Sequence, residues 1–143
     1  LDPENDRLFV AVFRIGRIIA IDLRTGNRTI ISGSNDAAGI EFVGEGPSLL
    51  GPAGIALTEG PGGLYVANDD LLHVDVATGN RTAISMLATD LGVSSVPGLK
   101  LLGHGGIALD AEAGFVYAAG GSLIGRFDLA TGDRKIVSTY RLW

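Results

Sequence analysis

Short apolar runs, each bounded by glycine or by charged residues, follow one another along the whole chain. Two of them, Gly54-Ile-Ala-Leu57 and Leu64-Tyr-Val-Ala67, return as Gly106-Ile-Ala-Leu109 and Val116-Tyr-Ala-Ala119. Runs of this length between turn residues are typical of β-strands, and their regular return is typical of a β-repeat protein. The pattern therefore predicts an all-β fold built from repeated units.

One seven-residue motif marks the period of the repeat. It occurs as Asp22-Leu-Arg-Thr-Gly-Asn-Arg28, Asp75-Val-Ala-Thr-Gly-Asn-Arg81 and Asp128-Leu-Ala-Thr-Gly-Asp-Arg134, and each copy begins 53 residues after the one before it. A complete unit then has an inner strand (Gly-Ile-Ala-Leu), a second strand (Leu-Tyr-Val-Ala), a third strand ending at the aspartate, a Thr-Gly turn and a fourth strand. Such a unit is a four-stranded antiparallel meander, the form of a β-propeller blade.

The third strand of the first unit, residues 18–23, indicates what surrounds each sheet. Its odd positions are all apolar, and two of its three even positions, Ile18 and Ala20, are apolar as well. A sheet with one face in water shows a cleaner alternation of apolar and polar residues. We therefore expect each sheet to pack between two neighbouring sheets, as radial packing in a propeller provides.

Three segments also carry a resemblance to known proteins. Leu64-Tyr-Val-Ala-Asn68, Val74-Asp-Val-Ala-Thr-Gly79 and Gly106-Ile-Ala-Leu-Asp110 resemble blades of the NHL, YVTN and SMP-30/gluconolactonase-like propellers. The resemblance covers nearly the whole chain, but proteins with unrelated functions share it. It implies about three blades of a ring that usually closes with six or seven, so we expect an incomplete ring.

The repeat divides the chain into blades and long connections. The predicted boundaries are blade 1 at 1–32, without most of its inner strand, a connector at 33–53, blade 2 at 54–85, a connector at 86–105, and blade 3 with the start of the next connection at 106–143.

The Thr-Gly turn predicts three ion pairs. If Arg24–Gly26 forms a three-residue hairpin loop with Gly26 in the left-handed conformation, Asp22 lies opposite Arg28. The same arithmetic pairs Asp75 with Arg81 and Asp128 with Arg134. Because these residues recur in every copy, we interpret them as structural.

The turns between second and third strands and the long connectors emerge on the same side of the sheets, which is the predicted ligand side. Its candidate residues are Asp36, Glu41, Glu45, Asn68, Asp69, Asp70, Asp90 and His104. Asn68–Asp70 carries oxygen atoms of the kind that Ca²⁺ binds, and an Asx turn is the alternative interpretation. His104 precedes an inner strand, where it could point into the mouth of the ring's channel.

Composition and charge exclude several kinds of partner and site. The net charge is −5 with only two lysines, which argues against nucleic acid as a partner. There is no cysteine, so disulfides and thiolate chemistry are excluded. The longest uncharged stretches are too short and too rich in glycine to span a membrane. Asn27 and Asn80 fit the N-glycosylation pattern, although repetition of the turn explains them equally well.

Three functional hypotheses remain, and no catalytic residue, cofactor or metal site is identified. The first is a non-catalytic extracellular or periplasmic propeller that acts as a binding or scaffold module for a protein, small-molecule or glycan ligand. The second is a Ca²⁺-dependent lactonase or esterase of the SMP-30 type with its site mostly outside this chain. The third is a structural subunit of a polymer or appendage. In each case we expect the terminal blades to contact further blades of a longer chain or other copies, giving a ring of about six blades.

Overall fold

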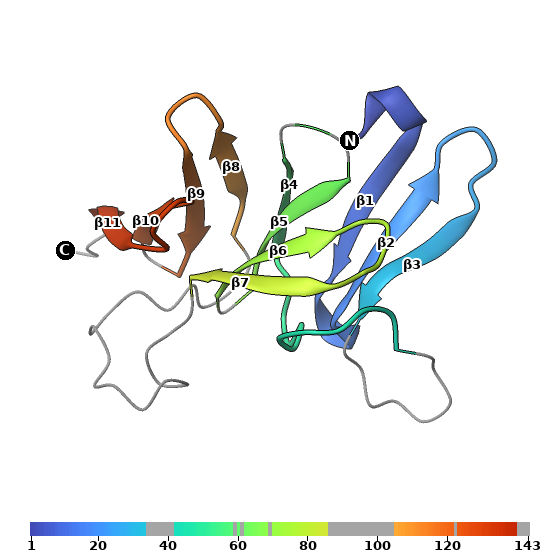
Figure 1. Ribbon diagram of the computed structural model, residues 1–143, viewed down its shortest axis with the longest axis horizontal. Helices are drawn as coiled ribbons and strands as arrows, with labels where there is room; N and C mark the ends of the chain where they lie inside the picture. The colour runs from blue at the N-terminus through green and yellow to red at the C-terminus, as the bar shows by residue number, and fades with distance from the viewer. Residues whose placement is uncertain are drawn as a thin grey trace.

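The computed structural model of the chain consists of three antiparallel β-sheets that stand side by side in sequence order (Figure 1). It describes residues 1–33, 42–58, 60, 62–68, 70–85, 105–121 and 123–139. In each sheet, strands that are neighbours in sequence pair with each other. The all-β fold of propeller blades is therefore confirmed, and we call the three sheets blades 1, 2 and 3.

Blade 1 is a three-stranded sheet in the order β1-β2-β3. Its elements are η1 (Pro3–Asn5), β1 (Arg7–Val12), η2 (Phe13–Ile15), β2 (Arg17–Asp22) and β3 (Arg28–Gly33). An isolated bridge joins Asp2 to Arg7. It occupies the place where the inner strands of the other two blades meet their second strands.

Blades 2 and 3 are four-stranded sheets with the same order of strands, inner strand first. Blade 2 has β4 (Gly54–Leu57), β5 (Gly63–Ala67), β6 (Leu71–Asp75) and β7 (Arg81–Ser85). Blade 3 has β8 (Ile107–Asp110), β9 (Phe115–Gly120), β10 (Leu123–Asp128) and β11 (Arg134–Thr139).

Two apolar cores lie between the blades, and we call these interfaces the first and second seams. The first seam, between blades 1 and 2, buries nine residues: Phe9, Ile18, Ala20, Ile31, Leu49, Leu64, Val66, Leu72 and Val74. The second seam, between blades 2 and 3, buries five: Ala67, Leu71, Val116, Ala118 and Phe127. Leu71 and Leu72 are adjacent on β6 but belong to different seams, so blade 2 packs between two neighbours as the sequence predicts.

Each blade has a β-bulge in its outer strand, which is the fourth strand of the repeat unit (β3, β7 and β11), at the same place in the repeat. In blade 1 the register passes from Ile18↔Ser32 to Ile19↔Ile30, so Ile31 is the extra residue. Ile84 and Val137 are the extra residues of blades 2 and 3. Ile31 packs into the first seam, while Ser32 beside it donates to a carbonyl of blade 2. The bulge thus turns two consecutive side chains toward the same neighbour, which a regular strand does not allow.

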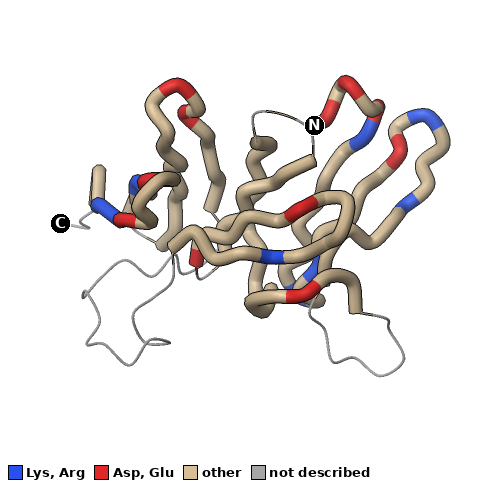
Figure 2. Tube along the Cα trace, in the orientation of Figure 1, with Lys and Arg blue, Asp and Glu red and all other residues tan. Residues whose placement is uncertain are grey.

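Charged residues gather at the turns and strand ends, and most of the strand interiors carry none (Figure 2). The outer strand β7 runs across the direction of the inner strand β4 in Figure 1, as the twist of a blade requires. The ends of β3 and β7 therefore reach the Thr-Gly hairpins of blades 2 and 3, respectively.

The Thr-Gly hairpins differ from the predicted three-residue loop by one position in register. Gly26 has φ +73°, so the left-handed glycine is confirmed. However, the backbone N–H of Asp22 donates to the carbonyl of Asn27, and Arg28 pairs with Ile21. Successive side chains on a strand point to opposite faces, so Asp22 and Arg28 lie on different faces of the sheet.

The predicted Asp22–Arg28, Asp75–Arg81 and Asp128–Arg134 pairs are therefore wrong. Arg81 is opposite Val74, and Arg134 is opposite Phe127, as in the first copy. The cause is local, because the aspartate accepts hydrogen bonds from N–H groups of the loop and holds a fourth residue in it.

Candidate functional site

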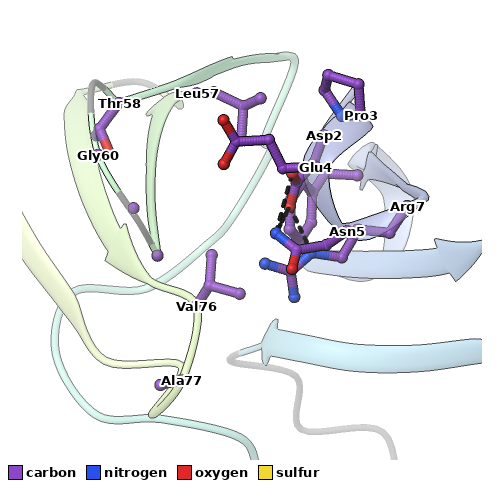
Figure 3. Close-up of a pocket in the computed structure, with 13 residues that line it drawn as sticks. Asp2, Pro3, Glu4, Asn5, Arg7, Leu57, Thr58, Gly60, Val76 and Ala77 are labelled. Carbon is purple, nitrogen blue, oxygen red and sulfur yellow. Dashed lines mark hydrogen bonds and ion pairs between the residues drawn. The ribbon is translucent and has the colours of Figure 1, made fainter.

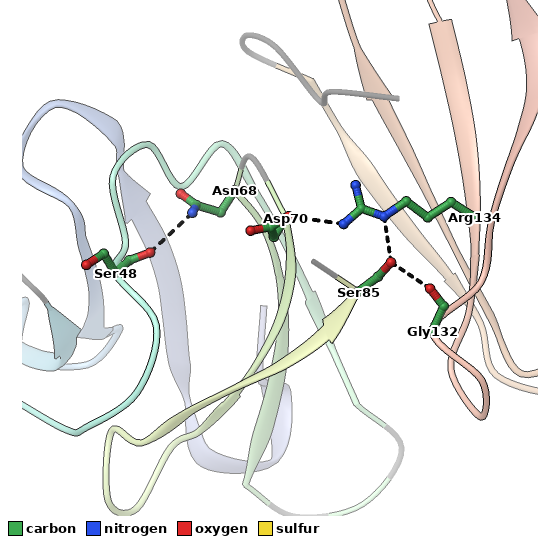
Figure 4. A network of polar contacts seen from close by, with 6 residues as sticks. All are labelled: Ser48, Asn68, Asp70, Ser85, Gly132 and Arg134. Carbon is green, nitrogen blue, oxygen red and sulfur yellow. Dashed lines mark hydrogen bonds and ion pairs between the residues drawn. The ribbon is translucent and has the colours of Figure 1, made fainter. Parts of the chain in front are cut away.

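Asn68 joins a connector to blade 2 through its side chain. It is buried in the turn between β5 and β6. Its Oδ1 accepts from the N–H of Gly51 at 2.9 Å, and its Nδ2 donates to the carbonyl of Ser48 at 3.2 Å (Figure 4). Its own N–H donates to the carbonyl of Asp70 at 2.8 Å, which closes the turn. The side chain thus joins the connector after blade 1 to blade 2.

Asp70 is directed to the opposite neighbour. Its Oδ1 lies 3.0 Å from Nη2 of Arg134 in blade 3, and both side chains are mostly buried. Arg134 Nε donates to Oγ of Ser85 at 2.6 Å, and the Ser85 hydroxyl donates to the carbonyl of Gly132 at 2.6 Å (Figure 4). These contacts join the end of β7 to the Thr-Gly hairpin of blade 3 across the second seam.

The first seam repeats this arrangement. The Ser32 hydroxyl donates to the carbonyl of Gly79 at 2.7 Å, and Arg81 Nη1 donates to Ser32 Oγ at 2.8 Å. We call the unit an Arg–Ser clasp: the serine near the end of one fourth strand, the Thr-Gly glycine of the next blade, and the arginine that begins the next fourth strand.

Arg81 also holds the connector that precedes β4. Its Nε donates to the carbonyl of Pro47 at 2.6 Å, and its Nη atoms donate to the carbonyls of Val43, Gly44 and Gly46 at 3.1, 3.3 and 3.4 Å. Burial lowers the pKa of Arg81, since it disfavours the charged form. The guanidinium stays charged and supplies several donors to backbone acceptors in one place.

The three repeated aspartates have a separate role inside their own hairpins. Asp22 Oδ1 accepts from the N–H groups of Arg24 at 2.9 Å and Thr25 at 2.7 Å. Asp75 and Asp128 accept in the same way in their blades. The N–H of the turn threonine is the main cause that lowers the pKa of each carboxyl, because it stabilises the charged form. They cap the turns, and their partners are loop N–H groups in place of the predicted arginines.

Glu45 is the remaining described candidate. Its N–H donates to Asn80 Oδ1 at 2.8 Å, and its carbonyl accepts from the N–H of Arg81 at 2.7 Å. The backbone of the connector therefore lies along the start of β7, and the Glu45 side chain is exposed. The other candidates, Asp36, Glu41, Asp69, Asp90 and His104, lie outside the described residues.

A groove of about 610 Å³ opens at the first seam, on the side of the β4–β5 and β6–β7 turns. Its walls are the turn before β1 and the β4–β5 and β6–β7 turns of blade 2, and Leu57 and Val76 form apolar surface inside it (Figure 3). This side is opposite to the β5–β6 turn that carries Asn68. The ligand side predicted from the sequence is the opposite side of the sheets.

Polar groups of the groove come from the first residues of the chain. Arg7 Nε donates to Asp2 Oδ2 at 2.6 Å, and Asn5 Nδ2 donates to both carboxylate oxygens of Asp2. The hydrogen bond from Arg7 is the main cause that lowers the pKa of Asp2. Glu4 extends its carboxylate across the groove toward Leu57 (Figure 3). The groove thus combines the Asp2–Arg7 ion pair and the Glu4 carboxylate with the apolar side chains of Leu57 and Val76.

Within the described residues, no three histidine, aspartate or glutamate side chains come together as a metal site would need. Over the same part of the chain, no helix has the length and apolar character needed to cross a bilayer.

Reasoning from single strands does not predict the clasp, although the sequence carries a signal for it. Ser32, Ser85 and Ser138 stand at the same place in the repeat, as do Arg28, Arg81 and Arg134. Assigning the arginines to their own hairpins left the serines without a role. Comparing neighbouring blades pairs Ser32 and Ser85 each with the arginine of the next blade.

Comparisons with known proteins show the fold. No family model matches the chain, and no curated protein matches its sequence. Among solved structures, the extracellular domain of a protein assigned to a one-component system of B. thetaiotaomicron aligns with a TM-score of 0.56 and 16% identity, covering 94% of this chain and 16% of that one. The extracellular domain of a hybrid two-component system from the same organism gives 0.54 and 16%, covering 96% and 17%. The chain therefore spans about one sixth of these structures and shares its fold with part of each.

Proposed function

We propose that the chain is a non-catalytic section of an extracytoplasmic β-propeller that acts as a binding or scaffold module. The observation that carries the proposal is the use of Asn68 and Asp70. Both stand on the predicted ligand side, and both bind other parts of the fold, the connector after blade 1 and Arg134 of blade 3. Their placement serves the assembly of blades.

The inner strands support the same proposal. An SMP-30-type hydrolase needs several carboxylate or amide side chains that converge on one divalent ion. β4 carries none, and the single carboxylate of β8, Asp110, is at the far end of the strand, where it accepts from the N–H of Ala113. A site of that kind would take its ligands from elsewhere.

The likeness to extracellular domains of signalling proteins supports the extracytoplasmic location and a role in recognition. For this chain, the groove at the first seam offers a recess for a protein, small-molecule or glycan ligand, with the Glu4 carboxylate on one wall. The side that carries the connectors, with Asp36, Glu41, Asp69, Asp90 and His104, stays a prediction.

Calcium calorimetry together with turnover of a lactone and a phosphotriester tests the proposal. We expect no Ca²⁺-dependent turnover by the chain. Turnover that requires Ca²⁺, is lost in Asp69→Asn and is kept in Glu112→Gln would contradict it and favour the hydrolase. Glu112 is a suitable control because it is exposed in the β8–β9 turn, away from the predicted ligand side.

A further inference from the structure

We infer that the groove at the first seam binds an organic cation, whose ammonium group pairs with Glu4 and whose apolar chain lies on Leu57 and Val76. The inference rests on the proposed binding function and deepens it by naming the class of ligand. It is carried by the charges, the apolar surface and the backbone of the described residues that line the groove.

The groove has the size of a small-molecule site. Its volume of about 610 Å³ lies in the range of roughly 300 to 1,000 Å³ that such sites occupy. Leu57 and Val76 of blade 2 form apolar surface inside it, and the Glu4 side chain reaches toward them from blade 1 (Figure 3). Both apolar side chains pack against the core of the first seam and remain partly exposed. An apolar group of a ligand can therefore remove this surface from water.

The charges of the groove favour a cation. Asp2 is already paired, because its Oδ2 lies 2.6 Å from Nε of Arg7, and the Arg7 guanidinium also lies 4.9 Å from the centroid of the Phe9 ring. Glu4 is different: its side chain is exposed, and no described residue pairs with its carboxylate. Two carboxylates and one guanidinium are the charged groups among the described lining residues, so their net charge is −1. The unpaired carboxylate attracts a cationic group and disfavours an anionic one.

The turn that carries Glu4 has a fixed backbone. Asp2 and Arg7 exchange backbone hydrogen bonds of 2.8 and 3.1 Å, which close the turn. The carbonyl of Asp6, a residue with a left-handed φ of 47°, accepts from the N–H of Leu23 at 2.8 Å and joins the turn to the end of β2. Because the backbone is already ordered, little ordering entropy opposes binding at Glu4.

The groove lies between two blades of this chain. Glu4 is directed toward blade 2 (Figure 3). The inner strands β4 and β8 run from the connector side to the groove side, where they end at Leu57 and Asp110. Leu1 stands at the place of Leu57 in the repeat, so a strand that leads to Leu1 approaches along β1 from the connector side. A strand in that position does not enter the groove.

The repeat supplies a matched control for Glu4. Glu112 stands at the same place in blade 3 and is also exposed, but it does not line the groove. In blade 2 the same place is occupied by Gly60, which does line the groove. A Cβ at Gly60 would meet nothing within 4 Å, so this wall leaves room for a ligand.

Titration of the ¹⁵N-labelled 143-residue chain with hexylammonium tests the inference by nuclear magnetic resonance. We expect saturable shifts of the backbone amides of Asn5, Gly62 and Ala77, which line the groove. Hexanoate, which has an anionic group in place of the ammonium, should give no saturable shift. Hexanol, which is uncharged, should bind about two- to fivefold more weakly than hexylammonium, because it lacks the ion pair with Glu4.

Variants separate the charge from the apolar contact. Glu4→Gln should raise the dissociation constant of hexylammonium about two- to fivefold, while Glu112→Gln should leave it unchanged. Glu4→Lys should reverse the preference, so that hexanoate binds and hexylammonium does not. Val76→Thr should weaken hexylammonium and hexanol by a similar factor, because it places a hydroxyl on the apolar wall. The amide spectra of the variants check that each of them is folded.

A second ligand distinguishes two sources of the ammonium group. A capped pentapeptide with one lysine between alanines presents the same group on a peptide. Tighter binding of this peptide than of hexylammonium supports the inference with a lysine of a protein partner as the source. Weaker binding supports it with a free amine as the source.

The absence of saturable shifts with hexylammonium overturns the inference. Equal affinities for hexylammonium and hexanoate do so as well, and so does a Glu4→Gln chain that binds hexylammonium as tightly as the wild type. These results are distinct from failure of the proposed function, which Ca²⁺-dependent turnover would show.

Discussion

Replacing the turn glycines by alanine should affect stability in blades 2 and 3 much more than in blade 1. The three glycines have nearly the same backbone, with φ +73° at Gly26, +75° at Gly79 and +76° at Gly132. A left-handed conformation costs an alanine roughly 1 kcal/mol relative to glycine at all three sites. At Gly79 the new Cβ also meets the carbonyl of Ile31 and lies 2.9 Å from Cγ1 of Val43. Overpacking of this kind adds about 1 to 3 kcal/mol.

Urea unfolding of the dilute chain measures the difference directly. Gly26→Ala should lower the free energy of unfolding by about 1 kcal/mol, and Gly79→Ala by about 2 to 4 kcal/mol. Gly132→Ala should resemble Gly79→Ala, because Ile84 meets its Cβ from the preceding blade. Equal losses at Gly26 and Gly79 would refute the reasoning, since the seam would then add nothing to the cost of the backbone.

Three further substitutions probe the seams and turns. Arg81→Ala should lower the free energy of unfolding by roughly 2 to 4 kcal/mol in the same assay, because buried carbonyls and Ser32 lose a charged donor. The exposed Arg24→Ala is the control, and a loss below about 0.5 kcal/mol for Arg81→Ala would contradict the clasp. Asn68→Ala should lower the free energy of unfolding by about 1 to 3 kcal/mol and increase proteolysis of the connector at residues 48–51. A variant whose connector resists proteolysis as well as the wild type does would contradict this prediction. Asp75→Asn should make the melting temperature fall less steeply as the pH is lowered. The pKa of Asp75 in the folded chain is lowered below 3.8, so its stabilisation is present above that value and is lost as the pH falls through the folded pKa. An unchanged acid profile would show that the Asp75 carboxylate does not stabilise the fold.

Much of the fold follows from periodicity in the sequence. The runs at 54–57 and 64–67 correspond to β4 and β5 within one residue of their observed bounds, and β6 ends at Asp75 as predicted. The apolar character of both faces of the third strand correctly predicted a blade between two others. These features depend on local patterning and on burial, which a single sequence records.

Register and long-range polar contacts were not predictable in the same way. The aspartate that caps loop N–H groups lengthens the hairpin by one residue, and this moves Arg28 to the other face of the sheet. The sequence around Ile31 does not mark the bulge, because an isoleucine fits a regular strand equally well. Arg81 and Ser32 are 49 residues apart, and their contact depends on the twist that brings one outer strand to the next hairpin.

A double-mutant cycle between Ser32→Ala and Arg81→Ala tests most directly whether the repeated polar residues serve the seams. The account predicts a coupling free energy of at least about 0.5 kcal/mol for this pair, because the two side chains share a buried hydrogen bond across blades. A parallel cycle between Asp75→Ala and Arg81→Ala should give a smaller value, within about 0.3 to 0.5 kcal/mol of additivity. Strong coupling of Arg81 to Asp75 and none to Ser32 would contradict the account.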